Sequence, residues 1–278
     1  MKKKYKIIIF LVSVACILFS YAYFIEPNML KVEHQTIKLN CLKSDISNQN
    51  FIQISDLHYT ENTSIEEIYR LESEIKNQNP VAVFITGDLI SDKDGIDSAI
   101  HLVEKLSNDF PIFVIFGNWD YWALDFSITD FQNKLENIGA NVLINSSVEL
   151  KFENESVNII GIKDPYTSGS IKMDLEKALY DVKNNNCNIL LAHSPDVIKE
   201  AAQNNINLAL VGHTHGGQIN IPYLTKKIIP ANPDGEGYIK GLYTKDNTIM
   251  YVNRGIGTSM LPLRFLNPPE ITLIKLIN

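Results

Sequence analysis

The first half of the chain alternates between short apolar runs and longer amphipathic segments. Strands are predicted at 51–55, 81–86 and 111–116, and helices at 65–76, 96–106 and 128–138. The strand runs are apolar without alternation, whereas the helical segments repeat apolar residues at a spacing near 3.6. Buried strands that alternate with helices in this way indicate a β-α-β arrangement.

The pattern changes beyond residue 140. Strands are predicted at 142–144, 148–152, 157–162, 188–192, 208–211, 249–253 and 271–275, helices at 175–182 and 195–203, and an edge strand at 32–39. The three closely spaced short strands, 142–144 to 157–162, are typical of a meander in a second sheet. We therefore predict an α/β fold in which two sheets form one domain, 51–278, with helices outside and a connecting segment at 27–50.

The N-terminus has its own pattern. Four lysines within the first six residues precede an uncharged run from Ile7 to Ile25. As a helix this run is about 28 Å long, close to the thickness of a bilayer's hydrocarbon core. We predict an uncleaved single-pass membrane anchor within 1–26; a cleaved signal and a buried core helix are the alternatives. The lysines should stay cytoplasmic, which puts the domain on the extracytoplasmic side.

Composition and charge limit the classes of molecule that the chain can bind. With 278 residues and a formal net charge of −7, the chain has no basic patch suited to nucleic acid, which we exclude as the main partner. A phosphate-containing small molecule or lipid-linked substrate stays compatible, because bound divalent cations reverse the local field. Of the three cysteines, Cys16 lies in the apolar run. We expect Cys41 and Cys187 to be buried free thiols, with a disulfide between them as the alternative.

Short polar motifs follow the predicted strands. They contain Asp56, His58, Asp88, Asn118, His193, His213 and His215. Ligand sites in α/β sheets gather at the carboxyl ends of strands, so these side chains should converge. Each motif alone is more often structural, but together they supply O and N donors for two divalent ions, of Mn, Fe, Zn or Co type. Asp88 is the natural bridging carboxylate, and ions about 3.5–4 Å apart can activate a shared water.

This ordered set resembles the signature of calcineurin-like metallophosphoesterases. The flanking stretches Gly216-Gly-Gln-Ile219, Asn253-Arg-Gly-Ile-Gly-Thr258 and Leu261-Pro-Leu-Arg264, with Pro269-Glu270 beyond them, are similar to those of a membrane-associated bacterial branch. That branch includes phosphodiesterases and enzymes that split UDP-2,3-diacylglucosamine. The resemblance implies a four-layer α/β/β/α sandwich. It also implies one metal held by Asp56, His58, Asp88 and His215, a second held by Asp88, Asn118, His193 and His213, and catalytic roles for Asp88, Asn118 and His213.

The sequence departs from this family at one position. The family usually continues Gly-Asn-His-Asp, where the histidine helps to protonate the leaving oxygen; this chain has Trp119 in that place. An indole cannot transfer a proton at working pH. Three interpretations stay open: the substrate has a leaving group of low pKa; Tyr121, Tyr59 or Arg264 takes the role; or Trp119 only packs.

Three residues near the motifs are candidates for binding substrate. Trp119 and Tyr121, with Trp122, would stack on a base or sugar or lie at the membrane surface, and core packing is the alternative. Arg264, in a proline-rich loop, would clamp a phosphate in a bidentate manner, and a surface salt bridge is the alternative.

These observations predict a membrane-anchored dinuclear phosphohydrolase. It would cleave a phosphodiester or pyrophosphate link of a membrane- or envelope-associated substrate by attack of a metal-bridging hydroxide. The alternative is a non-catalytic, metal-stabilised binding or scaffold protein of the same fold.

Overall fold

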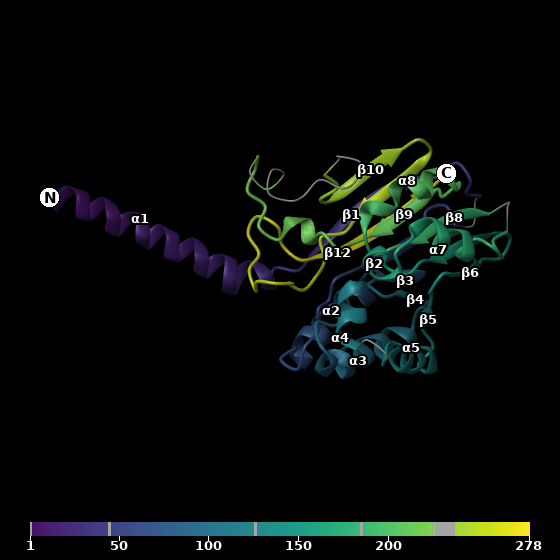
Figure 1. The fold of residues 1–278 in the computed structure, drawn as a ribbon, viewed down its shortest axis with the longest axis horizontal. Helices are drawn as coiled ribbons and strands as arrows, with labels where there is room; N and C mark the ends of the chain where they lie inside the picture. Colours follow the sequence, from purple (N-terminus) through teal and green to yellow (C-terminus); the bar gives the residue numbers. More distant parts are fainter. Residues whose placement is uncertain (1, 44–45, 125–126, 184–185, 224, 226–236) are drawn as a thin grey trace.

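Two six-stranded sheets face each other and carry helices on their outer sides (Figure 1). The computed structural model of the chain describes residues 2–43, 46–124, 127–183, 186–223, 225 and 237–278. The arrangement confirms the predicted four-layer α/β/β/α architecture.

The first sheet contains the strands that follow one another early in the chain. Its order is β1 (Lys31–Lys38), β12 (Glu270–Ile277), β2 (Asn50–Ile54), β3 (Ala82–Thr86), β4 (Ile112–Ile115) and β5 (Asn141–Val142). Strands β2 to β5 are parallel neighbours, whereas β12 runs antiparallel to β2 and parallel to β1. The carboxyl ends of β2, β3 and β4 therefore lie side by side.

The second sheet is also mixed. Its order is β10 (Gly241–Lys245), β11 (Thr248–Val252), β9 (Leu208–Val211), β8 (Cys187–Leu191), β7 (Ser156–Gly161) and β6 (Ser146–Lys151). The predicted meander is wrong in one respect, because the first of its three strands, β5, pairs with β4 in the first sheet. Strand β10 was not predicted, since its alternating exposed residues follow a Gly/Pro-rich segment that resembles a loop.

Helices cover both outer faces. The first sheet is covered by α2 (Ile65–Asn77), α3 (Ile96–Ser107), α4 (Asn118–Leu124) and α5 (Ile128–Asn137), and the second by α7 (Ile171–Ala178) and α8 (Ile198–Gln203). The short helix α6 (Pro165–Ser168) has no buried residue. Short 3-10 turns occur at Glu26–Asn28, Lys93–Gly95, Pro195–Val197 and His215–Gly217. Helix α2 begins at a capping box in which Glu67 N donates to Ser64 Oγ at 3.2 Å and Ser64 N donates to Glu67 Oε2 at 3.1 Å.

The core consists of three apolar layers. Phe51, Phe84 and Phe113 point between the sheets, while their neighbours along the strands, such as Ile52 and Val83, point toward the helices. Because side chains alternate along a strand and both faces are covered, the strands are apolar without interruption.

The N-terminal helix stands apart from these layers. Helix α1 (Lys2–Ser20) continues as a π-helical turn (Tyr21–Ile25) and projects from one end of the domain (Figure 1). The segment Lys3–Asn28 is long and apolar enough to cross a membrane, and 6% of its most apolar stretch is buried. This low burial is inconsistent with the alternative of a core helix.

A disulfide joins Cys41 to Cys187, with Cα atoms 5.4 Å apart. The expectation of two free thiols is therefore wrong. The connection between β1 and β2 brings Cys41 beside the first residue of β8, at the end of that strand opposite the predicted ligands. This proximity depends on the packing of the two sheets, which the spacing of the cysteines does not show.

Candidate metal centre

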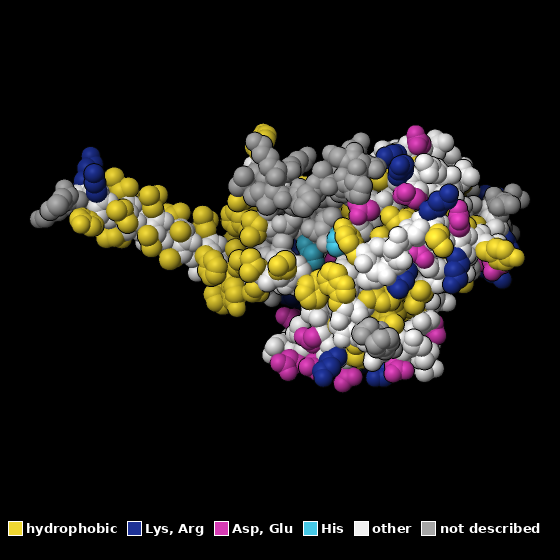
Figure 2. All heavy atoms as spheres, viewed as in Figure 1, with side chains coloured by type: hydrophobic (Ala, Val, Ile, Leu, Met, Phe, Trp, Pro, Cys, Tyr) yellow, Lys and Arg dark blue, Asp and Glu magenta, His cyan; other side chains and the backbone are white. Residues whose placement is uncertain are grey.

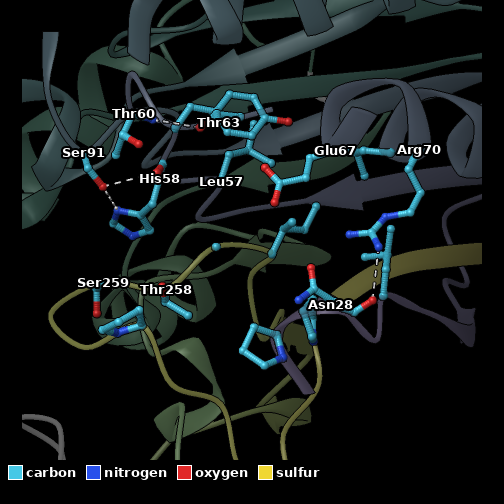
Figure 3. Close-up of a pocket in the computed structure, with 18 of the residues that line it drawn as sticks. Asn28, Leu57, His58, Thr60, Thr63, Glu67, Arg70, Ser91, Thr258 and Ser259 are labelled. Carbon is cyan, nitrogen blue, oxygen red and sulfur yellow. Dashed lines mark hydrogen bonds between the residues drawn. The ribbon is translucent and has the colours of Figure 1, made fainter. Parts of the chain in front are cut away.

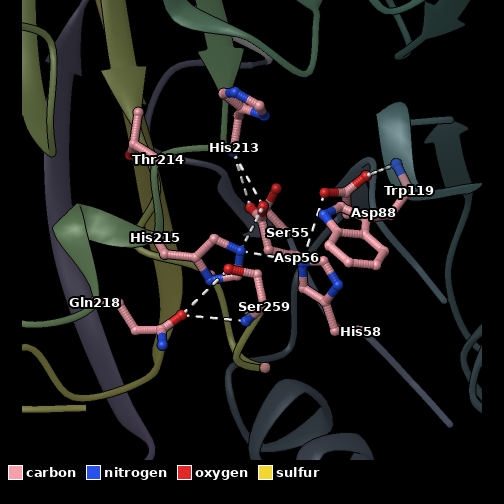
Figure 4. Close-up of polar contacts among 12 residues, drawn as sticks. Ser55, Asp56, His58, Asp88, Trp119, His213, Thr214, His215, Gln218 and Ser259 are labelled. Carbon is pink, nitrogen blue, oxygen red and sulfur yellow. Dashed lines mark hydrogen bonds and ion pairs between the residues drawn. The ribbon is translucent and has the colours of Figure 1, made fainter. Parts of the chain in front are cut away.

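All seven predicted ligands directly follow or begin at the carboxyl ends of five strands. Figure 4 shows that Asp56, His58, Asp88 and His215 lie close together. Asp56 and His58 follow β2, Asp88 follows β3, Asn118 follows β4, His193 follows β8, and His213 and His215 follow β9. The first sheet contributes mainly oxygen donors and the second contributes imidazoles. The remaining histidines lie elsewhere, His34 on β1 and His101 on α3.

Six of these residues form two clusters, each with one carboxylate and two imidazoles. One contains Asp56, His58 and His215, and the other Asp88, His193 and His213; within each, the possible ligand atoms lie within 4.8 Å of one another. The two clusters correspond to the division between two metals that the family resemblance implies.

The carboxylate of Asp88 lies between the clusters. Its Oδ2 is 3.1 Å from His193 Nε2 in its own cluster and 3.5 Å from His58 Nε2 in the other. Its Oδ1 accepts a hydrogen bond from the backbone N–H of Trp119 at 2.8 Å, which fixes the orientation of the carboxylate. Asp88 is thus within reach of possible ligand atoms of both clusters.

The backbone at these ligands is unusual. Five of the seven have φ between 51° and 70°: Asp56, His58, Asp88, His213 and His215. This left-handed region typically costs non-glycine residues about 1–3 kcal/mol and is concentrated at functional sites. It turns the chain sharply after each strand, so that side chains from adjacent loops point to a common centre.

The loops hold one another in this conformation. Asp56 N donates to Gly87 O at 2.9 Å, and the N–H of His213 donates to the Asp56 carboxylate at 3.0 and 3.1 Å. Two glycines permit the close approach: a Cβ on Gly212 would collide with Ser55 and Asp56, and one on Gly117 would collide with Asp88. The Asp120 carboxylate accepts from Gly117 N and Ile90 N at 2.9 and 3.0 Å and so fixes the loop that carries Asn118.

Burial sets the protonation of the imidazoles. It lowers the pKa of His58 to about 4 and that of His213 to about 3, and it lowers the pKa of His215 well below its usual value. These three rings are neutral near pH 7, as metal ligation requires. At His193 burial acts in the same direction, but the carboxylates of Asp88 and Asp56 outweigh it and raise the pKa.

The polar atoms fit divalent cations better than they fit one another. Nε2 of His58 and Nε2 of His215 lie 3.0 Å apart, so two neutral rings direct nitrogen atoms at each other. Buried Asn118 Oδ1 has no hydrogen-bond partner among the described residues. His193 Nδ1 lies 2.8 Å from the carbonyl oxygen of Thr86, which assigns its proton to Nδ1 and leaves Nε2 directed at the centre.

The family model for calcineurin-like phosphoesterases matches residues 50–217, from the start of β2 to the last ligand loop. The chain belongs to this family.

Three relatives indicate the branch of the phosphoesterase family. The uncharacterized metallophosphoesterase YkuE of Bacillus subtilis is 32% identical, over 93% of this chain and 89% of its own length. The UDP-2,3-diacylglucosamine pyrophosphatase LpxG of Chlamydia trachomatis is 24% identical, over 92% of each chain. The phosphodiesterase YaeI of Escherichia coli is 24% identical, over 93% of each.

A cavity of about 540 Å³ adjoins the phosphoesterase centre (Figure 3). His58, Trp119 and Ser91 line one part of it, and Tyr23 and Asn28 line another part, next to α1. The indole of Trp119 meets the ring of His58 edge-on, with centroids 5.5 Å apart. Trp119 therefore lines the cavity beside the cluster formed by Asp56, His58 and His215.

Tyr121 adopts the packing alternative, whereas Arg264 differs from both of its interpretations. Tyr121 is half-buried against Phe116, under the ammonium group of Lys163. Arg264 is fully buried, so neither the phosphate clamp nor the surface salt bridge is correct. Its guanidinium donates to four backbone carbonyl oxygens, those of Arg254, Gly255, Gly257 and Asn267, at 2.6–3.2 Å.

Several residues of the site were not predicted. The hydroxyl of Ser91 lies 3.1 Å from Nδ1 of His58 and orients that ring. Tyr166 stacks on His213 with ring centroids 4.9 Å apart and is 57% exposed, so it forms part of the rim. One signal for Tyr166 was available, because Asp164-Pro165-Tyr166 follows a strand end as the ligand motifs do.

Proposed function

We propose that this phosphoesterase is a dinuclear metal-dependent hydrolase of a phosphodiester or pyrophosphate bond. The observation that carries the proposal is the position of Asp88, with one carboxylate oxygen within 3.5 Å of an imidazole nitrogen from each cluster. A single-metal site or a purely structural ion would not need a second cluster of one carboxylate and two imidazoles beside the first.

The roles of the side chains follow from their positions. Asp56, His58 and His215 would hold one cation, His193, His213 and Asn118 the other, and Asp88 would contact both. Two bound divalent ions supply activation of water and neutralisation of phosphate charge for an in-line displacement. Thr86 and Ser91 keep His193 and His58 oriented, which typically matters about 10–100-fold for metal affinity or activity.

The substrate class is inferred from the relatives and from Trp119. The names of LpxG and YaeI point to a pyrophosphate or phosphodiester bond. Trp119 lines the cavity beside His58 and supplies no acid. Loss of a general acid costs about 10²–10⁴-fold, least when the leaving group is already good. The proposed substrate therefore has a leaving group of low pKa, and rates for aryl phosphodiesters of graded leaving-group pKa should fall steeply as that pKa rises. A flat dependence would contradict this.

We further propose that α1 anchors the enzyme in a membrane with the catalytic domain on the extracytoplasmic side. The lysines before the apolar run favour a cytoplasmic N-terminus. The disulfide between Cys41 and Cys187 supports the same orientation, because disulfides persist in oxidising compartments. A reporter enzyme fused to the C-terminus tests it; activity of a reporter that works only in the cytoplasm would refute it.

Metal-dependent turnover tests the catalytic proposal. Full-length protein freed of metal with a chelator should hydrolyse bis(p-nitrophenyl) phosphate only after Mn²⁺, Fe²⁺, Zn²⁺ or Co²⁺ is restored. Asp88→Asn and His213→Ala should abolish turnover, whereas His34→Ala, which removes an exposed imidazole on β1, should not. Bound metal without turnover of any phosphodiester or pyrophosphate would favour the binding protein instead.

A further inference from the structure

Residues 21–28 connect α1 to the domain, and we call this segment, with the loop residues that it contacts, the foot of α1. Two loops beside it expose apolar side chains. We call these side chains the apolar collar: Ile221 (40% exposed), Met260 (87%), Leu261 (55%) and Leu266 (51%). Figure 2 shows hydrophobic side chains gathered where the helix meets the domain. Single exposed apolar residues are common, but a contiguous group marks an interaction site.

The loops of the collar carry no exposed charge. Residues 216–223 contain no charged residue, and residues 257–266 contain only Arg264, which is buried. A solvated loop would ordinarily present charged side chains. The composition instead suits an environment that disfavours charge and accepts aliphatic side chains.

The collar is fixed relative to the helix. The N–H of Arg264 donates to the carbonyl oxygen of Ala22 at 3.0 Å, and the buried carboxylate of Glu26 accepts from Leu266 N at 2.9 Å and from Asn267 N. The ring of Tyr21 meets that of Phe265 edge-on at 6.3 Å. These contacts hold residues 264–267 at the level of the last turns of the apolar span.

The two loops are also tied to each other. Ser259 N donates to Gln218 Oε1 at 3.1 Å, and Asn220 N donates to the carbonyl oxygen of Phe265 at 2.8 Å. The 216–221 loop therefore shares the level of the 259–266 loop. The collar is continuous with the surface that α1 offers to lipid.

We propose that the apolar collar lies in the interfacial region of the same bilayer that α1 spans, as a second membrane contact. The inference rests on the proposed membrane anchor. Amphipathic segments of this kind bury their apolar face about 5–10 Å into the headgroup boundary. Because Tyr23, Asn28 and Pro262 line the cavity beside the metal clusters, this contact places the cavity next to the bilayer surface. A phosphate group at the end of a lipid would then reach the site without leaving the membrane.

Lipid quenching of a fluorescent probe tests the collar without using catalysis. Cys16, in α1, is the free cysteine of the chain, so Cys16→Ala with Met260→Cys gives one labelling site. Tyr180, just after α7, is also 87% exposed and serves as a matched control through Tyr180→Cys. Each full-length variant carries an environment-sensitive dye and is reconstituted in vesicles of phosphatidylcholine and phosphatidylglycerol, with or without spin-labelled lipid.

We expect the probe at position 260 to be blue-shifted and quenched by the labelled lipid at least about twofold more than the probe at 180, as for a side chain at the headgroup boundary. Equal quenching at the two positions would overturn the proposal. A blue shift without lipid quenching would also overturn it, because a second copy or another protein would then cover the collar. A probe on the native Cys16 separates the two claims: if it is quenched while position 260 is not, the anchor stands and the collar fails.

Discussion

The metal centre and the foot of α1 both bury charged side chains in loops, but they satisfy those charges in opposite ways. At the foot, the guanidinium of Arg264 donates to four carbonyl oxygens, and the carboxylate of Glu26 accepts from two N–H groups. At the centre, carboxylate and imidazole atoms face one another across 3.0–3.5 Å. Buried polar groups normally have hydrogen-bond partners. The fully bonded charges at the foot therefore stabilise the fold, whereas the facing ligand atoms at the centre indicate a binding site.

The largest expected effect comes from Asp88→Asn, which removes the carboxylate between the clusters. We expect turnover of bis(p-nitrophenyl) phosphate to fall by more than the roughly 100-fold that outer-shell substitutions reach, and bound metal to fall below two ions per chain. Metal analysis and steady-state kinetics measure both.

The stability of the metal-free protein should depend little on Asp88 at the metal centre. In chelator, Asp88→Asn should unfold at nearly the same denaturant concentration as the wild type, because loss of the ion pair with His193 is offset by relief of the repulsion between Asp88 and the buried carboxylates of Asp56 and Asp120. A large loss of stability without metal would mean that the centre is architectural too.

Substitution of Arg264 at the foot should lower stability but leave metal binding intact. Arg264→Met removes the guanidinium donor from four carbonyl oxygens, of which that of Gly255 keeps a second donor in Glu270 N. We expect the substitution to lower the free energy of unfolding by about 3 kcal/mol, within the range for unsatisfied buried groups. Urea unfolding of the full-length protein in detergent measures this, with the surface substitution Lys172→Met as control. The folded variant should still bind two metal ions. Wild-type stability with a raised KM for bis(p-nitrophenyl) phosphate would instead restore the phosphate-clamp interpretation.

This contrast explains what the sequence could predict. The grouping of six candidate ligands into two clusters could be predicted because each follows a strand, and buried strands are recognised by their apolar runs. The two-sheet fold was predictable for the same reason. The position of Arg264 could not be predicted, since its partners are backbone carbonyls of residues 254–267, a loop held by hydrogen bonds to Ala22 and Glu26 beyond the end of α1. The disulfide likewise depends on how the sheets meet, 146 residues apart in sequence.

Trp119→His tests whether the centre lacks only a proton donor. We expect this substitution to accelerate hydrolysis of aryl phosphodiesters with the poorest leaving groups by about tenfold, less than the 10²–10⁴-fold of an optimised acid, and to leave the best leaving groups unchanged. The measured quantity is the dependence of kcat on leaving-group pKa. Trp119→Phe is the control for lost packing. Acceleration that is uniform across the series would show that the indole affects access to the cavity rather than proton transfer.

The smallest expected effect is that of Glu26→Gln, which keeps the shape of the side chain. One of the two carboxylate oxygens is replaced by an NH2 group, which cannot accept a hydrogen bond, so one of the two N–H groups, of Leu266 or Asn267, loses its acceptor. We expect a loss of about 1 kcal/mol in the free energy of unfolding, no change in metal content, and weaker lipid quenching of a probe at position 260. Glu33→Gln, which alters an ion pair with Arg254 away from the helix, is the matched control. Lower metal content without a change in the free energy of unfolding would show that the foot and the metal centre are coupled. The buried charges at the foot would then serve metal binding as well as the fold, which would contradict the comparison.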